Sequence, residues 1–370
     1  MSAERIVAVL GRRDEPTDGV SDYCEFLAGA LPLYGYELET YRVPWADRGW
    51  SSALGELSEK ATEWHGCSAF LQFTALAWSR HGFPIRAPAV LNVLSRNGVR
   101  TGVVFHEFDP FGGSGWVGRA RCACQRSVLK RLYQNSQHAI FTVPLKNVSW
   151  LGSETARAAF IPVGANCPAC TARNLSVANK TMTVGVYCLT LGRHMLTEVG
   201  DITCALKSAS EAIGPLNVIV LGRGSREAEP RLLSDLAGTR VDVKTLGVLT
   251  PERISQTLAG VDVLLSVRGH ISNRRGSAIV GVACGLPIVC YRGRDTCGPI
   301  TEAGILDVPY GDRIALAHAL KTVLSDDALR KELADRSRRA QELYFSWPAI
   351  ASHFVATLQG QNSLTTSTAR

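Results

Sequence analysis

The chain has 370 residues, of which 46% are hydrophobic and 20% are charged, and its formal net charge is +7. This length favours two domains with separate cores, and no apolar run is long enough to span a bilayer. The positive excess is too small to indicate nucleic-acid binding, and it suits an anionic small substrate or an acidic membrane surface. The first apolar segment, Ile6–Leu10, runs into Arg12 and Arg13, which indicates a buried strand and not a signal peptide. We therefore expect a cytoplasmic α/β protein.

Strand-like and helix-like segments alternate through the first half of the chain, which is typical of a parallel sheet with crossover helices. The predicted strands are 5–10, 36–43, 69–73, 102–105, 139–143 and 159–162, and the predicted helices are 20–33, 54–64, 89–97 and 117–133. Gly19 and Ser21 lie where the first helix begins. His106, Glu107 and Asp109 follow the strand 102–105. Ligands bind at the carboxyl ends of such strands, so these residues are candidates for a site.

The second half repeats the alternation. The predicted strands are 183–189, 216–221, 241–246, 261–267 and 288–291, and the predicted helices are 201–213, 229–236, 251–259, 278–284, 313–324, 327–344 and 349–358. A basic loop with Arg268, Arg274 and Arg275 precedes the helix 278–284, for which Ser277 is the predicted N-cap and Gly285 the C′ residue. Cations at a helix N-terminus predict a phosphate or diphosphate site, and a solvated basic loop is the alternative.

The eleven cysteines form no evenly spaced framework, and three of them lie inside predicted buried elements: Cys188, Cys284 and Cys290. Free thiols in a reducing compartment are the simplest interpretation. The alternatives are a zinc site built from the pairs Cys122, Cys124 and Cys167, Cys170, or a disulfide between the last two. The first pair lies on a predicted helix, where residues i and i+2 point apart, so we expect no metal site.

Several short stretches carry a resemblance to a known family. In chain order they are Asp18–Tyr23, His106–Phe108, Leu191–Arg193, Val220–Gly224, Leu246–Val248, Ala283–Val289 and Phe345–Trp347. In this order and spacing they make the chain similar to glycosyltransferase family 4, a group with the GT-B fold that uses nucleotide-sugar donors. The similarity covers nearly the whole chain.

The resemblance implies two Rossmann-like domains that face each other across a cleft. Residues 1–165 would bind the acceptor, 166–180 would be a linker, and 181–345 would bind the nucleotide sugar. Residues 346–358 would form a C-terminal helix that crosses back to the N-terminal domain. The Ser/Thr/Gln-rich residues 359–370 are predicted to be a disordered tail.

The resemblance also implies site residues. Arg193 matches an arginine that faces the donor diphosphate, His106 matches a position near the reacting sugar, and the loop at Gly19 would approach the ligand closely because glycine has no side chain. Together with the basic loop this gives three sets. The catalytic set is His106, Arg193 and Arg268; the donor-binding set is Gly19, Arg193, Arg223, Arg268, Arg274, Arg275 and Ser277; the acceptor-binding set is Ser21, Glu107 and Asp109.

One departure from the family pattern affects the chemistry. The family carries two glutamates in an E-x7-E pattern, and by spacing these positions are Ser272 and Val280 here. The expected function is transfer of a sugar from a nucleotide-diphosphate sugar to a glycan, lipid-linked or small-molecule acceptor, with retention of configuration and without a metal or further cofactor. Two alternatives stay open. One is a nucleotide-sugar-binding partner protein without catalysis. The other is a sugar-nucleotide epimerase of similar fold, for which Asp109 with His270 is the hint.

A lipid-linked acceptor would place the protein at the inner face of the membrane as a peripheral protein. No nucleic-acid partner is expected, and no feature of the sequence indicates an oligomeric state.

Overall fold

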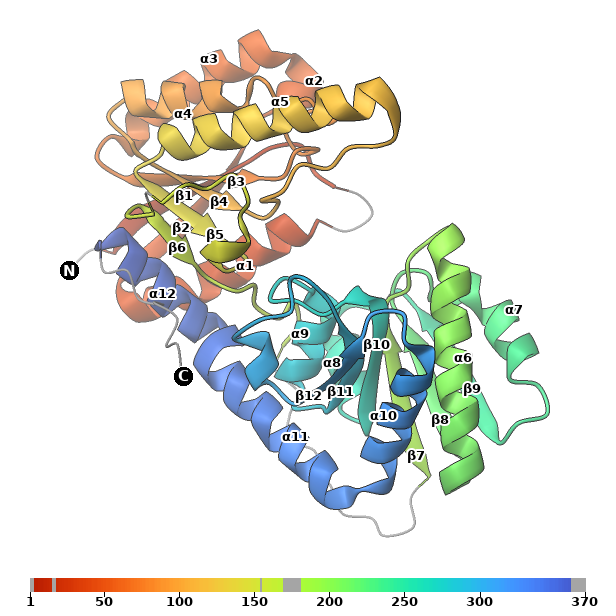
Figure 1. The fold of residues 1–370 in the computed structure, drawn as a ribbon. Helices are drawn as coiled ribbons and strands as arrows, with labels where there is room; N and C mark the ends of the chain where they lie inside the picture. Colours follow the sequence, from red (N-terminus) through yellow and green to blue (C-terminus); the bar gives the residue numbers. More distant parts are fainter. Residues whose placement is uncertain (1–2, 15–17, 154, 169–180, 361–370) are drawn as a thin grey trace. The chain divides into compact units, whose positions relative to one another are not determined.

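A computed structural model describes residues 3–14, 18–153, 155–168 and 181–360. The chain divides into two compact units: unit 1 comprises Met1–Pro162 and Trp347–Arg370, and unit 2 comprises Val163–Ser346. Each unit is built on one six-stranded sheet whose paired strands are all parallel, with helices on both faces (Figure 1). Most of the predicted linker 166–180 and of the predicted tail 359–370 lies outside the described residues.

The sheet of unit 1 has the strand order β2-β1-β3-β4-β5-β6. Its strands are β1 (Glu4–Leu10), β2 (Tyr36–Arg42), β3 (Ser68–Phe73), β4 (Arg100–Phe105), β5 (His138–Phe141) and β6 (Ala158–Phe160). Its helices are α1 (Gly19–Ala30), η1 (Leu31–Tyr34), α2 (Trp45–Arg48), α3 (Trp50–Ala61), η2 (Thr62–Trp64), α4 (Ala87–Arg96), α5 (Gly115–Gln134), η3 (Leu145–Asn147) and α12 (Trp347–Leu358). The sequence predicts each of these strands to within three residues at either end.

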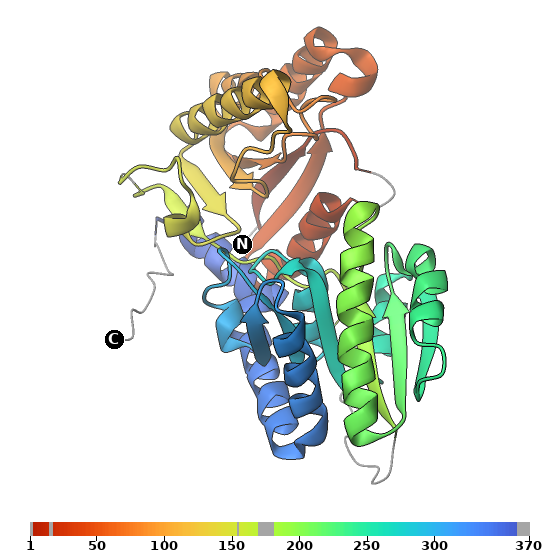
Figure 2. The same cartoon turned by 45° about the vertical axis from the view of Figure 1, so that its right-hand side comes forward.

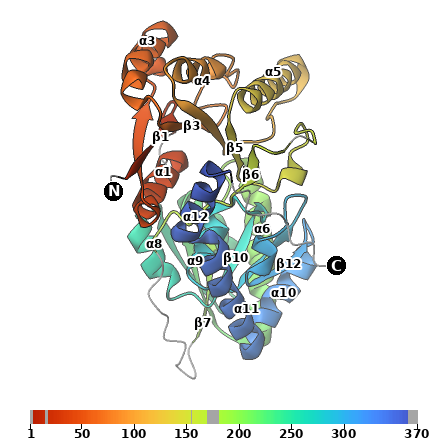
Figure 3. The same cartoon turned by 90° about the vertical axis from the view of Figure 1, so that its left-hand side faces the viewer.

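The apolar pattern of the strands explains the layers of unit 1. All six residues of β3 are buried, so both faces of the sheet must be covered. Helices α3, α4 and α5 cover one face, and α1 and α12 cover the other (Figures 1 and 3). On the second face the rings of Phe70 and Phe354 lie 4.7 Å apart, and Trp347 stacks on Phe26 at 5.5 Å. The last described helix of the chain is thus part of the core of the first unit.

The sheet of unit 2 has the strand order β12-β11-β10-β7-β8-β9. Its strands are β7 (Met182–Tyr187), β8 (Leu216–Leu221), β9 (Val241–Gly247), β10 (Val263–His270), β11 (Ile288–Arg292) and β12 (Ile305–Pro309). Its helices are α6 (Arg193–Ile213), α7 (Ser225–Asp235), α8 (Pro251–Leu258), α9 (Gly276–Ala283), η4 (Ile300–Glu302), α10 (Arg313–Ser325), α11 (Asp327–Ala340) and the π-helical turn η5 (Gln341–Phe345).

Alternating side chains of β10 divide the core of unit 2. Val263 and Leu265 pack with α6, α7 and α10, whereas Leu264 packs with α8 and α9. The 21-residue helix α6, green in Figure 2, runs along the first face beside α10. This double layer leaves the ends of the strands, and not their faces, available for ligands.

Three local predictions around this sheet are wrong, and each has a physical reason. β10 continues to His270, so Arg268 lies in the strand and not in a loop. Arg275 and not Ser277 occupies the N-cap position of α9, because the helix begins two residues earlier than predicted, at Gly276 instead of Ala278. The edge strand β12 was not predicted, since its five residues include Asp307 and a proline. The C′ position of Gly285 is confirmed by its φ of +63°.

The cysteines exclude one alternative and correct one expectation. Cys167 is a free thiol, so the disulfide between Cys167 and Cys170 is wrong. Cys284 is disulfide-bonded, where a free thiol was expected. The other described cysteines are not disulfide-bonded, and the described residues contain no group of three or more His, Cys, Asp or Glu side chains that could hold a metal ion. No helix in the described ranges is long and apolar enough to cross a membrane.

Candidate functional site

The strand order of unit 2 defines one point on its sheet where a ligand site is expected. From β7 the chain builds outward through β8 and β9 on one side and through β10, β11 and β12 on the other. Parallel sheets bind ligands at the carboxyl ends of the strands where the order reverses in this way. A pocket of about 430 Å³ lies at this place, between β7 and β10. It is lined by Thr190, His194, Thr197, Glu198, Asp201, Val267, Arg268, Gly269, Arg275 and Tyr310.

Two arginines give this pocket its charge. Arg268 is half-buried near the end of β10, and Arg275 is half-buried at the start of α9. The Nε atom of Arg275 is buried and has no hydrogen-bond partner within the described part of the chain. Burial lowers the pKa of Arg275, the positive charges of Arg268 and Arg274 lower it further, and Glu198 is among the groups that oppose the shift. Such a crowded guanidinium is stabilised by an anion.

Helix starts add positive potential at the same edge. The helices that follow the three central strands, α6, α7 and α9, have Gly192, Gly224 and Arg275 as N-cap residues, and none has a side-chain cap. The helices α8 and α10, which follow edge strands, are capped by Thr250 and Asp312. Uncapped N–H groups at the positive end of a helix bind anions. The central strands thus lead to helix starts that are open to a phosphate.

The carboxylates that line the pocket are engaged in hydrogen bonds. Glu198 is buried and accepts hydrogen bonds from the amide (2.7 Å) and the hydroxyl (2.6 Å) of Thr190, which fixes the loop after β7. Asp201 is also buried and accepts hydrogen bonds from Tyr291 (2.9 Å) and Arg313 (2.8 Å). These groups position the loops, and the arginines dominate the potential inside the pocket.

The structure brings together three of the predicted donor-binding arginines. Arg268, Arg223 and Arg275 all lie close enough to the Cys188 thiol for their charges to lower its pKa. Burial of the thiol has the opposite and larger effect. Arg193 is the first residue of α6, and its side chain lies outside what the structure describes. The donor-binding roles of all four arginines stay predictions. The same holds for Arg274, which is exposed, for Ser277, the half-buried second residue of α9, and for Gly19 in unit 1.

The two positions of the missing glutamates lie beside this site. Ser272 is 3% exposed and Val280 is 2% exposed, and Val280 packs in the core of unit 2. Asn273, which lies between these two positions in the sequence, has a structural role. It donates to the carbonyl groups of Cys297 and Gly298 at 3.0 Å each and accepts from the amide of Ile300 at 2.8 Å. It therefore holds residues 297–300 against the start of α9.

His106, at the end of β4, is the best-defined candidate in unit 1. Its Nε2 atom lies 2.8 Å from Oε1 of Gln72, whose own amide nitrogen contacts the carbonyl oxygen of Phe70 at 3.4 Å. Because Gln72 turns its oxygen toward the ring, Nε2 of His106 is the donor and Nδ1 keeps a lone pair. Burial lowers the pKa of His106 to about 4, against the opposing charge of Asp18. The imidazole is therefore neutral at pH 7 and can accept a hydrogen bond.

The start of α1 is arranged around an ion pair. Asp18 is the N-cap of α1, whose first residue is Gly19, and it accepts a hydrogen bond from the amide of Ser21 at 3.2 Å. The Ser21 hydroxyl donates to Asp18 at 2.7 Å and accepts from Arg42 at 2.6 Å, and Arg42 also pairs with Asp18 at 3.1 Å. The carboxylate thus already occupies this helix start, which is why it differs from the open starts in unit 2.

The other two predicted acceptor-binding residues also hold backbone segments or neighbouring side chains. Glu107 accepts a hydrogen bond from the amide of Ala75 at 2.7 Å, and Asp109 lies 3.4 Å from the hydroxyl of Ser149. Both are half-buried at the carboxyl end of β4. Their predicted contact with an acceptor stays a prediction.

A second pocket, of about 610 Å³, lies at the carboxyl ends of β1 and β2. Its lining includes Arg12, Arg13 and Arg42, which the sequence analysis did not assign to a site. The signal that could have identified them is two arginines directly after the first buried strand. A glycine is needed at position 11, because a Cβ atom there would overlap the carbonyl group of Ala77 in the loop after β3. The loops after β1 and β3 are therefore in contact, at the point where the strand order of unit 1 reverses.

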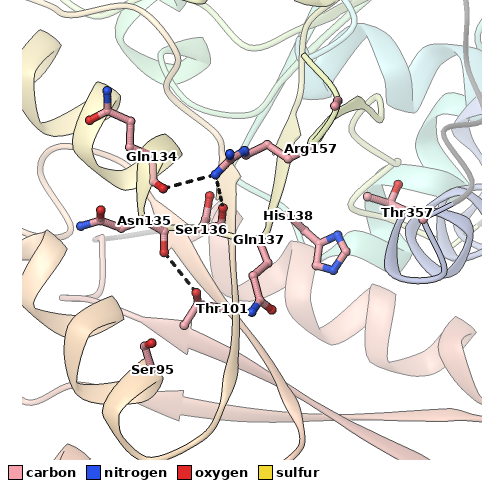
Figure 4. Close-up of a pocket in the computed structure, with 11 residues that line it drawn as sticks. Ser95, Thr101, Gln134, Asn135, Ser136, Gln137, His138, Arg157 and Thr357 are labelled. Carbon is pink, nitrogen blue, oxygen red and sulfur yellow. Dashed lines mark hydrogen bonds between the residues drawn. The ribbon is translucent and has the colours of Figure 1, made fainter. Parts of the chain in front are cut away.

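A third pocket, of about 560 Å³, lies at the opposite edge of the unit 1 sheet, near the amino ends of β4 and β5 (Figure 4). Its one cation, Arg157, donates to the carbonyl groups of Gln134 (3.2 Å) and Ser136 (3.1 Å), and Thr101 donates to that of Asn135 (3.2 Å). These groups tie the end of α5 to the sheet. These polar groups already bond the backbone, and the strand order of this sheet reverses between β1 and β3 and not at this pocket. We therefore do not assign the functional site to this pocket.

Comparison with solved structures identifies the architecture. A glycosyltransferase from Rickettsia africae matches with a TM-score of 0.67 and 13% identity over 98% of this chain and 100% of that one. HepE of Anabaena, solved in complex with UDP and glucose, matches with a TM-score of 0.64 and 14% identity over 96% and 99%. A UDP-N-acetylglucosamine 2-epimerase of Listeria monocytogenes, named only provisionally, matches with 0.58 and 10% over 96% of both chains.

The chain has the GT-B fold. The fold predicted from the sequence is therefore confirmed. No protein-family profile matches the sequence, and a search of curated proteins finds no relative. Since an epimerase shares this architecture with the transferases, the function has to be argued from the site.

Proposed function

We propose that this protein is a glycosyltransferase that moves a sugar from a nucleotide-diphosphate sugar to a hydroxyl group of an acceptor. The observation that carries the proposal is the pocket between β7 and β10, where Arg268 and the unpartnered Arg275 Nε atom meet the open starts of α6 and α9. A diphosphate matches this combination in charge and in the number of hydrogen-bond acceptors. HepE binds UDP and UDP-glucose, so uridine donors are the first to test.

The proposed chemistry follows from the charge that develops in the reaction. The bond between the anomeric carbon and the diphosphate oxygen breaks, the diphosphate keeps the electron pair, and the acceptor oxygen bonds to the same carbon while its proton leaves. Negative charge therefore grows on the diphosphate. Arg268 and Arg275 and the backbone N–H groups of the helix starts stabilise that charge without a metal. Arg193 and Arg223 are proposed as further donor contacts.

His106 is proposed as a contact to the transferred sugar. A neutral imidazole whose Nε2–H is held by Gln72 presents Nδ1 as an acceptor for a sugar hydroxyl. Its depressed pKa keeps it uncharged beside an electron-poor anomeric carbon. Ser21, Glu107 and Asp109 are proposed for the acceptor side, whose occupant is a glycan, a lipid-linked glycan or a small molecule.

Retention of configuration is part of the proposal. Ser272 and Val280 provide no carboxylate beside the donor site, so a mechanism in which the departing diphosphate itself takes the acceptor proton fits these residues best. Peripheral association with the inner face of the membrane is proposed for a lipid-linked acceptor.

The test is a thermal-shift screen with UDP, GDP, ADP and TDP and their common sugars. A ligand that binds the native state raises the melting temperature by mass action. We expect a shift with one nucleotide class, and we expect Arg268→Ala and Arg275→Ala to abolish it. Arg339→Ala is the matched control, because Arg339 is exposed on α11, outside the pocket lining. Absence of a shift with every nucleotide would refute the donor site.

A second candidate is a nucleotide-sugar-binding protein without transferase activity, favoured by the buried Ser272 and Val280 where the family has glutamates. Hydrolysis of the donor by the purified protein separates the two, because a binding protein leaves the donor intact. The epimerase alternative has less support. Both side chains that hint at an epimerase already have partners within their own units: His270 lies 3.5 Å from Asp295, and Asp109 lies 3.4 Å from the hydroxyl of Ser149.

A further inference from the structure

The positive charge of the chain is concentrated in one segment of unit 1. Residues 75–134 contain nine of the 40 Lys and Arg residues but only two of the 33 Asp and Glu residues, Glu107 and Asp109. This local excess of seven equals the net charge of the whole chain, so the remaining residues are balanced. A local excess of cations favours interaction of this segment with an anionic partner.

Helix α5 carries most of this charge and has no acidic residue among its 20 positions. Gly118 lies on the buried side of α5 and packs directly against the backbone of Gly113. A Cβ atom at position 118 would overlap the Gly113 carbonyl group, so only glycine permits this contact. The opposite side of the helix faces the solvent. The exposed residues there are Trp116, Val117, Arg119, Ala120, Ala123, Arg126, Ser127, Lys130 and Arg131. We call this set the α5 face.

The α5 face also has an apolar end. Trp116 is 76% exposed, although an indole of this size is normally well buried in a soluble protein. Val117 beside it is also exposed. An exposed aromatic side chain followed along the helix by arginine and lysine is the pattern of a helix that lies in a membrane interface.

The neighbouring loop extends the same chemistry. Residues 79–86 pack on α5 through the Arg121 guanidinium, 5.6 Å from the ring centroid of Phe83, and through a 2.8 Å hydrogen bond from Gln125 to the carbonyl group of Gly82. The loop then presents its own exposed residues, Arg80, His81, Ile85 and Arg86, and Ile85 is 65% exposed. Helix α5 lies at the outer side of its unit, with α4 next to it (Figures 1 and 3).

We propose that the α5 face and the loop 79–86 dock on the surface of a bilayer that contains anionic phospholipids. The cations attract the lipid phosphates, and Trp116, Val117 and Ile85 insert at the level of the headgroups. A nucleic acid is the less suitable occupant, because none of the pockets described above includes the α5 face and a convex helix offers no groove for a strand. The inference gives the proposed peripheral association a surface, and it does not depend on donor binding or catalysis.

The experiment is co-sedimentation of the full chain with vesicles, without nucleotide or acceptor. Vesicles of phosphatidylcholine alone are compared with vesicles that also contain phosphatidylglycerol. We expect binding to the second kind only, weakened by added salt. Arg119→Ala and Arg126→Ala should each weaken the partition coefficient by about fivefold, since a basic residue near such a surface contributes about 1 kcal/mol. Trp116→Ala should weaken binding at high salt as well, because its contribution is apolar.

Matched controls separate docking from general surface effects. Ile314→Ala removes an 82% exposed apolar side chain on α10, and Arg339→Ala removes an exposed arginine on α11. Both should bind as the unchanged protein does, and all variants should keep its melting temperature because every substituted side chain is exposed.

The proposal fails if the protein sediments equally with both vesicles or with neither, or if the α5 variants bind like the controls. It also fails if single-stranded RNA, tested in parallel, binds through the α5 face while vesicles do not. If no nucleotide shifts the melting temperature but the vesicles bind, the donor site is rejected and the membrane-docking proposal is retained.

Discussion

Gly269 lies against the guanidinium group of Arg275, so that a Cβ atom at position 269 would stand 3.2 Å from Nη2 of the arginine. The φ angle of Gly269 is +64°, a left-handed conformation that glycine adopts without cost. A residue with a Cβ atom at position 269 would therefore have a strained backbone and would contact the guanidinium group of Arg275. A substitution here tests whether the placement of Arg275 matters.

Gly269→Ala is expected to destabilise the fold by about 1–2 kcal/mol, because a left-handed residue with a Cβ atom is strained. It should also weaken nucleotide-diphosphate binding by about tenfold, or about 1.4 kcal/mol, by displacing Arg275. Urea unfolding and isothermal titration calorimetry measure the two effects. Gly214→Ala is the control: its φ is +98°, but nothing lies within 4 Å of the added methyl group. It should lose stability and keep its affinity; equal losses of affinity in both variants would argue against the role of Arg275.

His106 predicts a pH dependence of stability. Burial depresses its pKa to about 4 in the folded protein, whereas an unfolded histidine titrates near 6.5. The unfolded chain therefore binds more protons below pH 6.5, and stability must fall as the pH falls from about 6.5 to about 4. Relative to His106→Gln, the unchanged protein should lose about 3 kcal/mol more between pH 7 and pH 4. Histidines common to both proteins cancel in this difference. Parallel pH profiles for the two proteins would show that the pKa of His106 is not depressed in the folded protein.

Asn273 is predicted to be a structural residue. It is fully buried and makes three hydrogen bonds to the backbone of residues 297–300. Asn273→Ala should lower the free energy of unfolding by about 3 kcal/mol, because the amide of Ile300 is left buried without its partner. Its neighbour provides the control, since Ser272→Ala removes a hydroxyl at a similarly buried position and should cost less than about 1 kcal/mol. Chemical denaturation of both variants measures this, and equal losses would contradict the assignment.

A substitution of Ser21 distinguishes a role in acceptor binding from a structural role. Its hydroxyl connects Asp18 and Arg42, so Ser21→Ala should destabilise unit 1 by about 1–2 kcal/mol. Nucleotide binding should not change. Ser51→Ala, at an exposed position of α3, should change stability by less than about 0.5 kcal/mol. If Ser21→Ala keeps full stability but raises the KM for the acceptor, its role is binding and not positioning.

The sequence predicted the layers of the fold because long apolar runs leave little choice. β8 was predicted at its observed limits, Leu216–Leu221, since all but one of its residues are apolar. The apolar pattern did not predict the end of a strand where polar residues extend it. Arg268 and Gly269 extend β10 because the pairing with β11 continues to His270 across a bulge, and no local pattern encodes a bulge.

The site was predictable in part for the same reason. Arg268 and Arg275 were found because they are cations beside a buried strand. Glu198 and Thr190 were missed because they line the pocket through a tertiary hydrogen bond, and the first two turns of α6 were taken as a loop. The engagement of Ser21 by Arg42 likewise depends on the pairing of β1 with β2, which brings together residues 21 positions apart in the chain.

Unit 1 is made of two pieces of chain that are separated by the whole of unit 2. During synthesis on a ribosome, the face of the sheet around Phe70 stays uncovered until residues 347–358 have emerged, because Phe354 and its helix complete that core. Unit 2 is contiguous and needs no later segment to complete its core. The first unit to be translated is therefore the last to be finished, and a released chain truncated before residue 347 would hold a folded unit 2 and, on unit 1, an open apolar surface that chaperones bind.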